Sequence, residues 1–233
     1  MPAMRWMRAS AWPVSASDEA RPCAISACRD LVEVNVAMRQ SAIMADALAA
    51  VPAPRLLADL GGGDGRFLLG VARRLAKRWP GVRAVILDQH DFVSCETRAG
   101  FAALGWHCDV LRGDVFSLLP RIEPDIVTAN LCLHHLEQRA LARLLAGVAA
   151  RASAFVACEP RRGRFALRGA RLAGVLGTNN VIRHDAVVSV RAGFDGNDLS
   201  ALWPRDGRWS VHENSVLPFT HVFKARRCDL LAV

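Results

Sequence analysis

The sequence predicts an α/β fold of the Rossmann-like kind, a doubly wound and mostly parallel sheet with helices on both faces. After Pro54, short apolar runs alternate with segments of helical periodicity, which is typical of parallel strands joined by crossover helices. One run, LLADL, continues directly into glycines and then into a helical segment. With 233 residues, 52% of them hydrophobic, the chain has enough apolar material for one packed domain.

The elements follow one another in a regular order. Helical segments over 64–78, 94–104 and 136–150 lie between the apolar runs, and two further runs, 208–213 and 219–226, predict a closing pair of strands. The strands expected before that pair are 55–60, 82–88, 108–114, 125–131 and 154–159.

Three segments lie outside this alternation. Residues 1–24 show no usable period and predict a loose arm. Between 26 and 50, apolar positions recur every three or four residues and stop before Pro52, which predicts a helix. Residues 160–207 interrupt the alternation as an insert. We therefore expect one domain over 25–233, without repeats or a low-complexity linker.

Composition excludes several classes of protein. The 30 basic and 22 acidic residues leave a net charge of +8, but the arginines are spread along the chain and there is no Tyr for base stacking, so a nucleic-acid partner is not favoured. The seven cysteines form no CxxC pair and lie mostly in apolar runs, which indicates thiols of a reducing compartment rather than a zinc site or disulfides.

The sequence also predicts a cytoplasmic protein. No apolar stretch approaches the roughly 18 to 20 residues of a membrane span. The first 20 residues contain arginines but no continuous apolar segment, so they make a poor signal peptide.

The strongest motif is LLADLGGGDGRFLLGVARRL, a strand followed by glycines and a helix. Glycines allow a sharp turn and close approach to a ligand, and a helix start offers N–H groups to an anion. The spacing excludes two ligand motifs: a dinucleotide GxGxxG from Gly61 would need a glycine where Arg66 stands, and a P-loop would need GK[ST]. A glycine turn without a ligand stays open.

The spacing that fits is DxGxGxG, through Asp59, Gly61, Gly63 and Gly65. It resembles the first motif of the class I S-adenosylmethionine-dependent methyltransferases, small-molecule type, and the resemblance extends over about 55–159. It implies S-adenosylmethionine as the cofactor and a seven-stranded sheet, in which the last two strands are the antiparallel pair. No motif suggests a metal centre.

Three further acidic or polar positions fit the resemblance. Asp88 ends the second strand, where a carboxylate accepts hydrogen bonds from ribose hydroxyls, with Gln89 and His90 bordering the nucleoside. Asp114 follows the third strand, where the resemblance implies an adenine contact, although a helix N-cap explains it equally. Asn130 ends the fourth strand, at the edge where open α/β sheets bind ligands.

Histidines are the candidate catalytic groups. His134 and His135 follow the fourth strand, and His184 precedes a short helical segment of the insert. We expect His135 to line the site and His184 to remove the acceptor's proton from a lid; simple packing of these histidines stays open. Glu159, which ends the fifth strand, is a weaker candidate.

The insert is expected to bind the acceptor. Arg161, Arg162 and Arg164 begin an arginine-rich stretch, which would contact an acidic carrier, a carboxylate or a membrane surface, or else form a solvated face. The resemblance implies methyl transfer to a small, apolar, hydroxylated acceptor, to oxygen rather than carbon. The alternatives are an RNA or protein methyltransferase and a non-catalytic S-adenosylmethionine-binding module.

Overall fold

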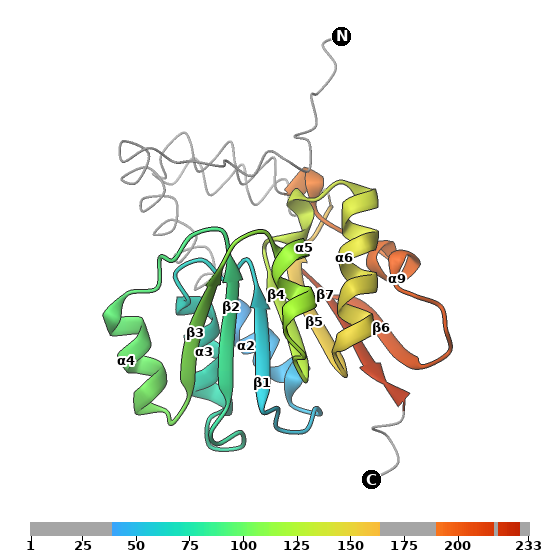
Figure 1. Ribbon diagram of the computed structural model, residues 1–233. Helices are drawn as coiled ribbons and strands as arrows, with labels where there is room; N and C mark the ends of the chain where they lie inside the picture. Colours follow the sequence, from blue (N-terminus) through green and yellow to red (C-terminus); the bar gives the residue numbers. More distant parts are fainter. Residues whose placement is uncertain (1–38, 164–189, 217–218, 229–233) are drawn as a thin grey trace, which may run out of the picture.

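The computed structural model describes residues 39–163, 190–216 and 219–228, which form a seven-stranded sheet with helices on both faces (Figure 1). The strand order is β3-β2-β1-β4-β5-β7-β6. The first five strands are parallel, and β7 is antiparallel to both β5 and β6. The predicted fold class, including the antiparallel closing pair, is confirmed.

The strands are β1 (Leu56–Leu60), β2 (Arg83–Asp88), β3 (His107–Arg112), β4 (Ile126–Asn130), β5 (Ala154–Pro160), β6 (Trp209–Val216) and β7 (Thr220–Arg227). The helices are α2 (Gln40–Leu48), α3 (Arg66–Leu75), α4 (Cys95–Ala103), α5 (Val115–Leu118), α6 (Gln138–Arg151) and α9 (Asp198–Leu202), with short 3-10 turns η2 (Leu119–Arg121) and η3 (Leu133–His135).

Two apolar layers hold the helices against the sheet. On one face, Leu48 of α2 and Leu68 of α3 pack with Leu57 of β1. On the other, Leu144 of α6 packs in a cluster with Ala58 of the same strand. Because successive side chains of a strand alternate between faces, Asp59 lies on the side of α2 and α3.

The expected boundaries shift where local chemistry intervenes. Leu131 has a φ of 52°, which ends β4 at Asn130, and the following 3-10 turn delays α6 to Gln138 instead of 136. Of the helix expected over 26–50, the described part is Gln40–Leu48; the arm over 1–24 lies outside the described residues.

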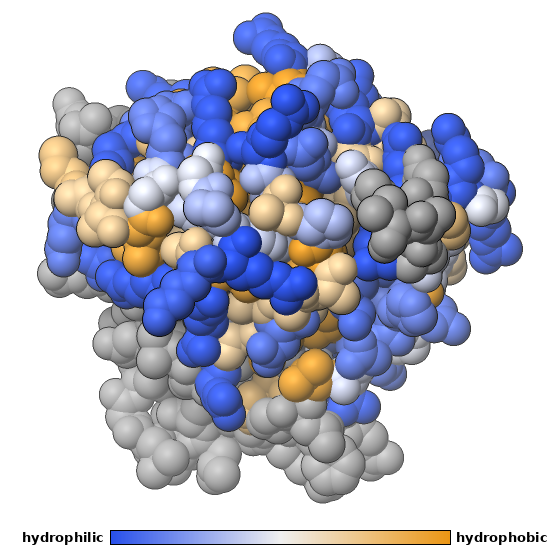
Figure 2. Space-filling model, turned by 90° about the horizontal axis from the view of Figure 1, so that it is seen from below, coloured by the Kyte–Doolittle hydropathy of each residue, from blue (hydrophilic) through white to orange (hydrophobic). Residues whose placement is uncertain are grey.

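The face seen from below in Figure 1 is where the parallel strands begin, and hydrophilic residues predominate on it (Figure 2). An exposed ion pair between Arg83 and Asp109, at 2.8 Å, lies at this edge. None of the helices in the described ranges is long and apolar enough to cross a membrane.

The end of the insert is tied to the end of β5. The N–H of Phe194 donates to the Pro160 carbonyl at 2.9 Å, and the N–H of Arg162 donates to the Phe194 carbonyl at 2.8 Å. A side chain on Gly193 would place its Cβ 2.2 Å from the Pro160 oxygen, so only glycine allows this approach.

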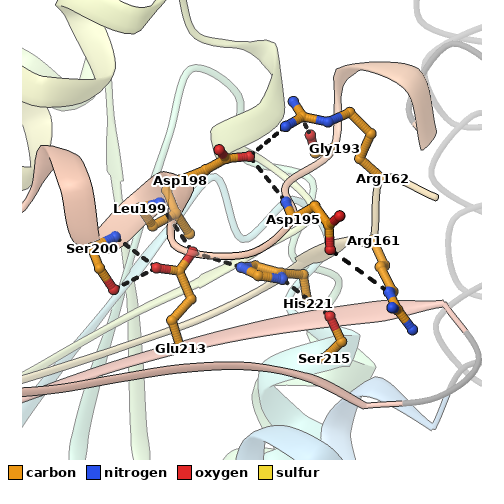
Figure 3. Close-up of polar contacts among 10 residues, drawn as sticks. All are labelled: Arg161, Arg162, Gly193, Asp195, Asp198, Leu199, Ser200, Glu213, Ser215 and His221. Atoms are coloured by element: carbon orange, nitrogen blue, oxygen red, sulfur yellow. Dashed lines mark hydrogen bonds and ion pairs between the residues drawn. The ribbon is translucent and has the colours of Figure 1, made fainter.

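Next to this contact, α9 begins without a hydrogen bond from the side chain of its own N-cap residue. The side chain of Asn197 makes no cap hydrogen bond. Glu213 of β6 instead accepts the N–H groups of Leu199 (3.0 Å) and Ser200 (2.7 Å), and the ring of the buried His221 lies 2.7 Å from its Oε1 (Figure 3). Burial alone would raise the pKa of Glu213, but these hydrogen bonds lower it below its ordinary value.

Gly193→Ala should lower the free energy of unfolding by about 1 to 3 kcal/mol, the usual cost of overpacking. Gly147→Ala is the matched control, because its added Cβ would meet only Leu119 at an ordinary 3.6 Å; it should stabilise α6 by up to about 1 kcal/mol. Denaturant unfolding measures both. Equal effects of the two substitutions would contradict the tight contact at Pro160.

Candidate functional site

The glycine-rich turn lies at the carboxyl end of β1, as predicted. Gly63 and Gly65 have φ angles of 55° and 74°, which side-chain-bearing residues rarely adopt. A Cβ on Gly65 would meet Ile86 at 3.0 Å, whereas a Cβ on Gly63 would meet nothing within 4 Å. Gly65 is therefore required for packing of α3, and Gly63 presents bare backbone to open space.

Asp59 lies beneath this turn and is 1% exposed. Its Oδ1 accepts the hydroxyl hydrogen of Thr128 at 2.7 Å, while its Oδ2 has no hydrogen-bond partner among the described residues. Burial raises the pKa of Asp59 to about 7; the Thr128 hydrogen bond opposes this shift and the charge of Asp88 adds to it.

Asp88 connects β2 to the turn. Its Oδ2 accepts the N–H of Gly63 and its Oδ1 the N–H of His90, both at 3.0 Å. A carboxylate oxygen can accept more than one hydrogen bond, so both retain capacity for a ligand hydroxyl. The His90 ring stacks on Phe92 at a centroid distance of 5.1 Å, and Gln89 is half-buried beside Asp88.

Asp114 is the N-cap of α5. Its side chain accepts the N–H of Phe116 at 3.2 Å, and the residue is exposed. The capping alternative is therefore realised; a contact with adenine stays a prediction.

The end of β4 approaches the glycine turn. Asn130 is 8% exposed at the last position of the strand. Two residues later, the Cβ of Cys132 lies 3.1 Å from where a Cβ on Gly61 would be. The turns after β1 and β4 therefore lie against each other, and the sheet brings the predicted positions Asp59, Gly61, Gly63, Gly65, Asp88 and Asn130 to one edge.

Glu159 organises the loop after β4. The residue is fully buried, and its Oε1 accepts the N–H groups of Cys132 (3.0 Å) and Leu133 (2.9 Å). Its Oε2 lies 2.7 Å from Nδ1 of His134 and accepts the His134 N–H at 3.4 Å. The carboxylate thus fixes both the backbone and the ring of His134.

His134, which the sequence places after the fourth strand without a role of its own, is held in a defined position. Its side chain is 3% exposed, and its Nε2 has no hydrogen-bond partner among the described residues. Because the carboxylate of Glu159 favours a proton on Nδ1, the neutral ring leaves Nε2 as an acceptor. A histidine after the fourth strand together with a strand-end glutamate was the available signal.

His135 has a different environment. Its ring lies 4.0 Å from that of His134, and the residue keeps substantial solvent exposure. Partial loss of hydration, reinforced by His134 and opposed by Glu159, lowers the pKa of His135 to about 4. At neutral pH it is therefore uncharged, which fits a lining position better than a strong base. His184, the other predicted catalytic histidine, lies outside the described residues.

Two arginines of the predicted cluster, Arg161 and Arg162, contact acidic side chains of the protein. Arg162 pairs with Asp198 at 2.7 Å, and Nε of Arg161 lies 4.0 Å from Asp195 (Figure 3). Both contacts bind the returning end of the insert to β5. Arg164 lies outside the described residues, so contact of this cluster with an acceptor or carrier stays a prediction.

Comparison with known sequences gives a partial likeness, and no protein-family model matches the chain. Over 89 residues, or 37% of the chain, it is 38% identical to proteins named uncharacterized methyltransferases from Mycobacterium bovis and Mycobacterium tuberculosis. The aligned segment spans 41% of the length of these curated relatives.

Solved structures extend the likeness to the whole fold. An O-methyltransferase family protein from Burkholderia thailandensis matches 85% of this chain and 58% of its own, with a TM-score of 0.57 and 18% identity. The plantazolicin methyltransferase BamL, in complex with a triazolic desmethylPZN analog and SAH, matches 86% and 89%, with a TM-score of 0.64 and 12% identity. The chain therefore has the fold of class I methyltransferases.

The buried Asp59 should make stability fall as pH rises. Its pKa is about 7 when folded against an ordinary 3.8, so the stabilisation that is complete below about pH 4 is lost as the pH rises through 7. Between pH 5 and pH 8 the free energy of unfolding should fall by roughly 2 to 3 kcal/mol more in the wild type than in Asp59→Asn. Urea unfolding at both pH values measures this; parallel pH profiles would refute it.

Proposed function

We propose that the protein is an S-adenosylmethionine-dependent methyltransferase that acts on a small, hydroxylated acceptor. The observation that carries the proposal is the Glu159–His134 pair, which leaves Nε2 of the buried His134 ring without a hydrogen-bond partner among the described residues. The pair belongs to the loop after β4, whose Cys132 lies against Gly61 of the turn that bears the DxGxGxG motif. A cofactor turn and a candidate base thus share one edge of the sheet, where open α/β sheets bind ligands.

The residues of this edge fit the cofactor. Gly63 leaves space for close approach, the orphaned Oδ2 of Asp59 lies beneath the turn, and Asp88 retains acceptor capacity for the ribose. Asp114 and Asn130 complete the proposed cofactor-binding residues. When bound, S-adenosylmethionine supplies an activated methyl group, so the protein's tasks are to align the acceptor and remove a proton.

The pair suits oxygen as the acceptor atom. A hydroxyl must lose its proton when it is methylated, and Nε2 of His134 can take that proton while Glu159 stabilises the resulting imidazolium. His134 therefore takes the role that the sequence suggested for His184, and His135 lines the site as a neutral ring. The solved neighbours named for small-molecule substrates, plantazolicin and a riboflavin derivative, support an acceptor of that size.

The cofactor assignment predicts that Gly63→Val abolishes S-adenosylmethionine binding, because the side chain would fill the space left for the ligand. Gly81→Val is the matched control: its φ of 68° and open surroundings give the same backbone strain in a turn before β2, far from the site. Asp88→Ala should weaken binding by about 1 to 3 kcal/mol. Calorimetry measures affinity, and equal losses for Gly63→Val and Gly81→Val would contradict the assignment.

The base assignment predicts that His134→Gln lowers kcat by roughly 100-fold or more, as loss of a general base does, while cofactor affinity stays unchanged. His135→Gln and His184→Ala serve as comparisons and should each retain most of the rate. The assay follows isotope-labelled methyl transfer from S-adenosylmethionine to pools of phenolic acceptors. Full activity of His134→Gln, together with loss of activity in His184→Ala, would instead identify His184 of the insert as the base.

A further inference from the structure

Asp59 is a buried acid beneath the glycine turn, and binding of a ligand by the backbone of that turn alone would not require an acid there. It is a carboxyl group in the apolar layer between the sheet and α3, with one oxygen bonded to Thr128. The other oxygen has no hydrogen-bond partner within the described ranges. That oxygen lies 2.6 Å from the position of a Cβ on Gly62, so the backbone of the turn covers it directly.

An ionised carboxylate in this position lacks compensation. A buried charge is strongly disfavoured unless it is paired and hydrogen-bonded, and one hydroxyl donor is a weak compensation. The charged group that acts on Asp59 is Asp88, which repels a second negative charge. The neutral acid is therefore more stable here than in an exposed carboxyl group, in agreement with the pKa of about 7.

Within the described part of the chain, the other titratable groups around Asp59 do not supply a positive charge. Burial raises the pKa of Cys108 on β3 to about 11 and that of Cys132 after β4 well above its ordinary value, so both thiols stay neutral. At the start of α3, Arg66 is exposed and its Nε lies 3.7 Å from Asp64. A cationic ligand at the turn would thus be the missing counter-charge.

We infer that a substantial fraction of the cofactor-free molecules holds a proton on Asp59 at neutral pH and releases it when S-adenosylmethionine binds at the glycine turn. The inference rests on the proposed function. S-adenosylmethionine carries a sulfonium and an ammonium charge against one carboxylate, and a nearby cation favours the ionised form of an acid. The O–H bond of Asp59 would break, the proton would pass to the buffer, and the carboxylate would keep the negative charge that favours a cationic ligand.

Proton release is measured by titration calorimetry of the full chain with S-adenosylmethionine at pH 7, in phosphate, HEPES and Tris. The dependence of the observed heat on the ionisation enthalpy of the buffer gives the number of protons released. With a pKa of about 7, half of the Asp59 groups are protonated, so the wild type should release about half a proton more than Asp59→Asn. Proton exchange by the cofactor itself is common to both proteins.

Affinity gives a second reading. In this inference S-adenosylmethionine binds only to molecules in which Asp59 is ionised. The affinity of the wild type for S-adenosylmethionine should therefore rise about tenfold between pH 6 and pH 8, beyond any change in Asp59→Asn. Thr128→Val removes the hydrogen bond that favours ionisation, and it should move the midpoint of this rise to higher pH even if Asp59→Asn binds too weakly to measure.

The outcomes separate the inference from the proposed function. Equal proton release in the wild type and Asp59→Asn, or an unmoved midpoint in Thr128→Val, would overturn the inference while the cofactor assignment stands. Absence of S-adenosylmethionine binding to the wild type would overturn both.

Discussion

The pairing of β1 with β4 is the constraint on which the candidate site depends. β1 pairs with β2 on one side and β4 on the other, so the strand order reverses beside it, which is where open α/β sheets leave a crevice at their carboxyl ends. The register sets Asp59 opposite Thr128, and it brings Cys132 against Gly61. A shift of one residue would turn Asp59 to the other face and separate it from its hydroxyl donor.

Several buried acidic side chains lie near this edge of the sheet, and they differ in the hydrogen bonds that offset the cost of burying their charge. Glu159 accepts three backbone N–H groups and faces the ring of His134. Glu213 is similarly saturated by α9 and His221, and His221 pairs in register with Glu159 between β5 and β7. These carboxylates fix loops and helices in the cofactor-free protein. Among the described residues Asp59 has one side-chain donor, the Thr128 hydroxyl, so its carboxyl group is the least compensated of the three.

The sequence predicts the fold and the glycine turn because both follow from local patterns. Apolar runs and glycine spacing depend on neighbours in the chain, and they located five parallel strands and the turn after Leu60 to within a few residues. The cap of α9 was not predictable in this way. Asn197 precedes the helix without capping it, whereas Glu213 comes from β6 and meets the start of α9 only in the folded protein.

Local sequence patterns also fail to distinguish His134 from His135 at the candidate site. Adjacent histidines are indistinguishable by composition, and in a regular helix either could face the crevice. The backbone after Asn130 instead passes through a left-handed residue, Leu131, into a 3-10 turn, and Glu159 captures the ring of the first histidine across 25 residues of sequence. The second ring lies tilted against the first at a centroid distance of 4.0 Å, and partial loss of hydration together with His134 lowers the pKa of His135 to about 4. The contact that distinguishes the two histidines therefore comes from a strand-end glutamate, and only the folded sheet brings that glutamate to the first ring.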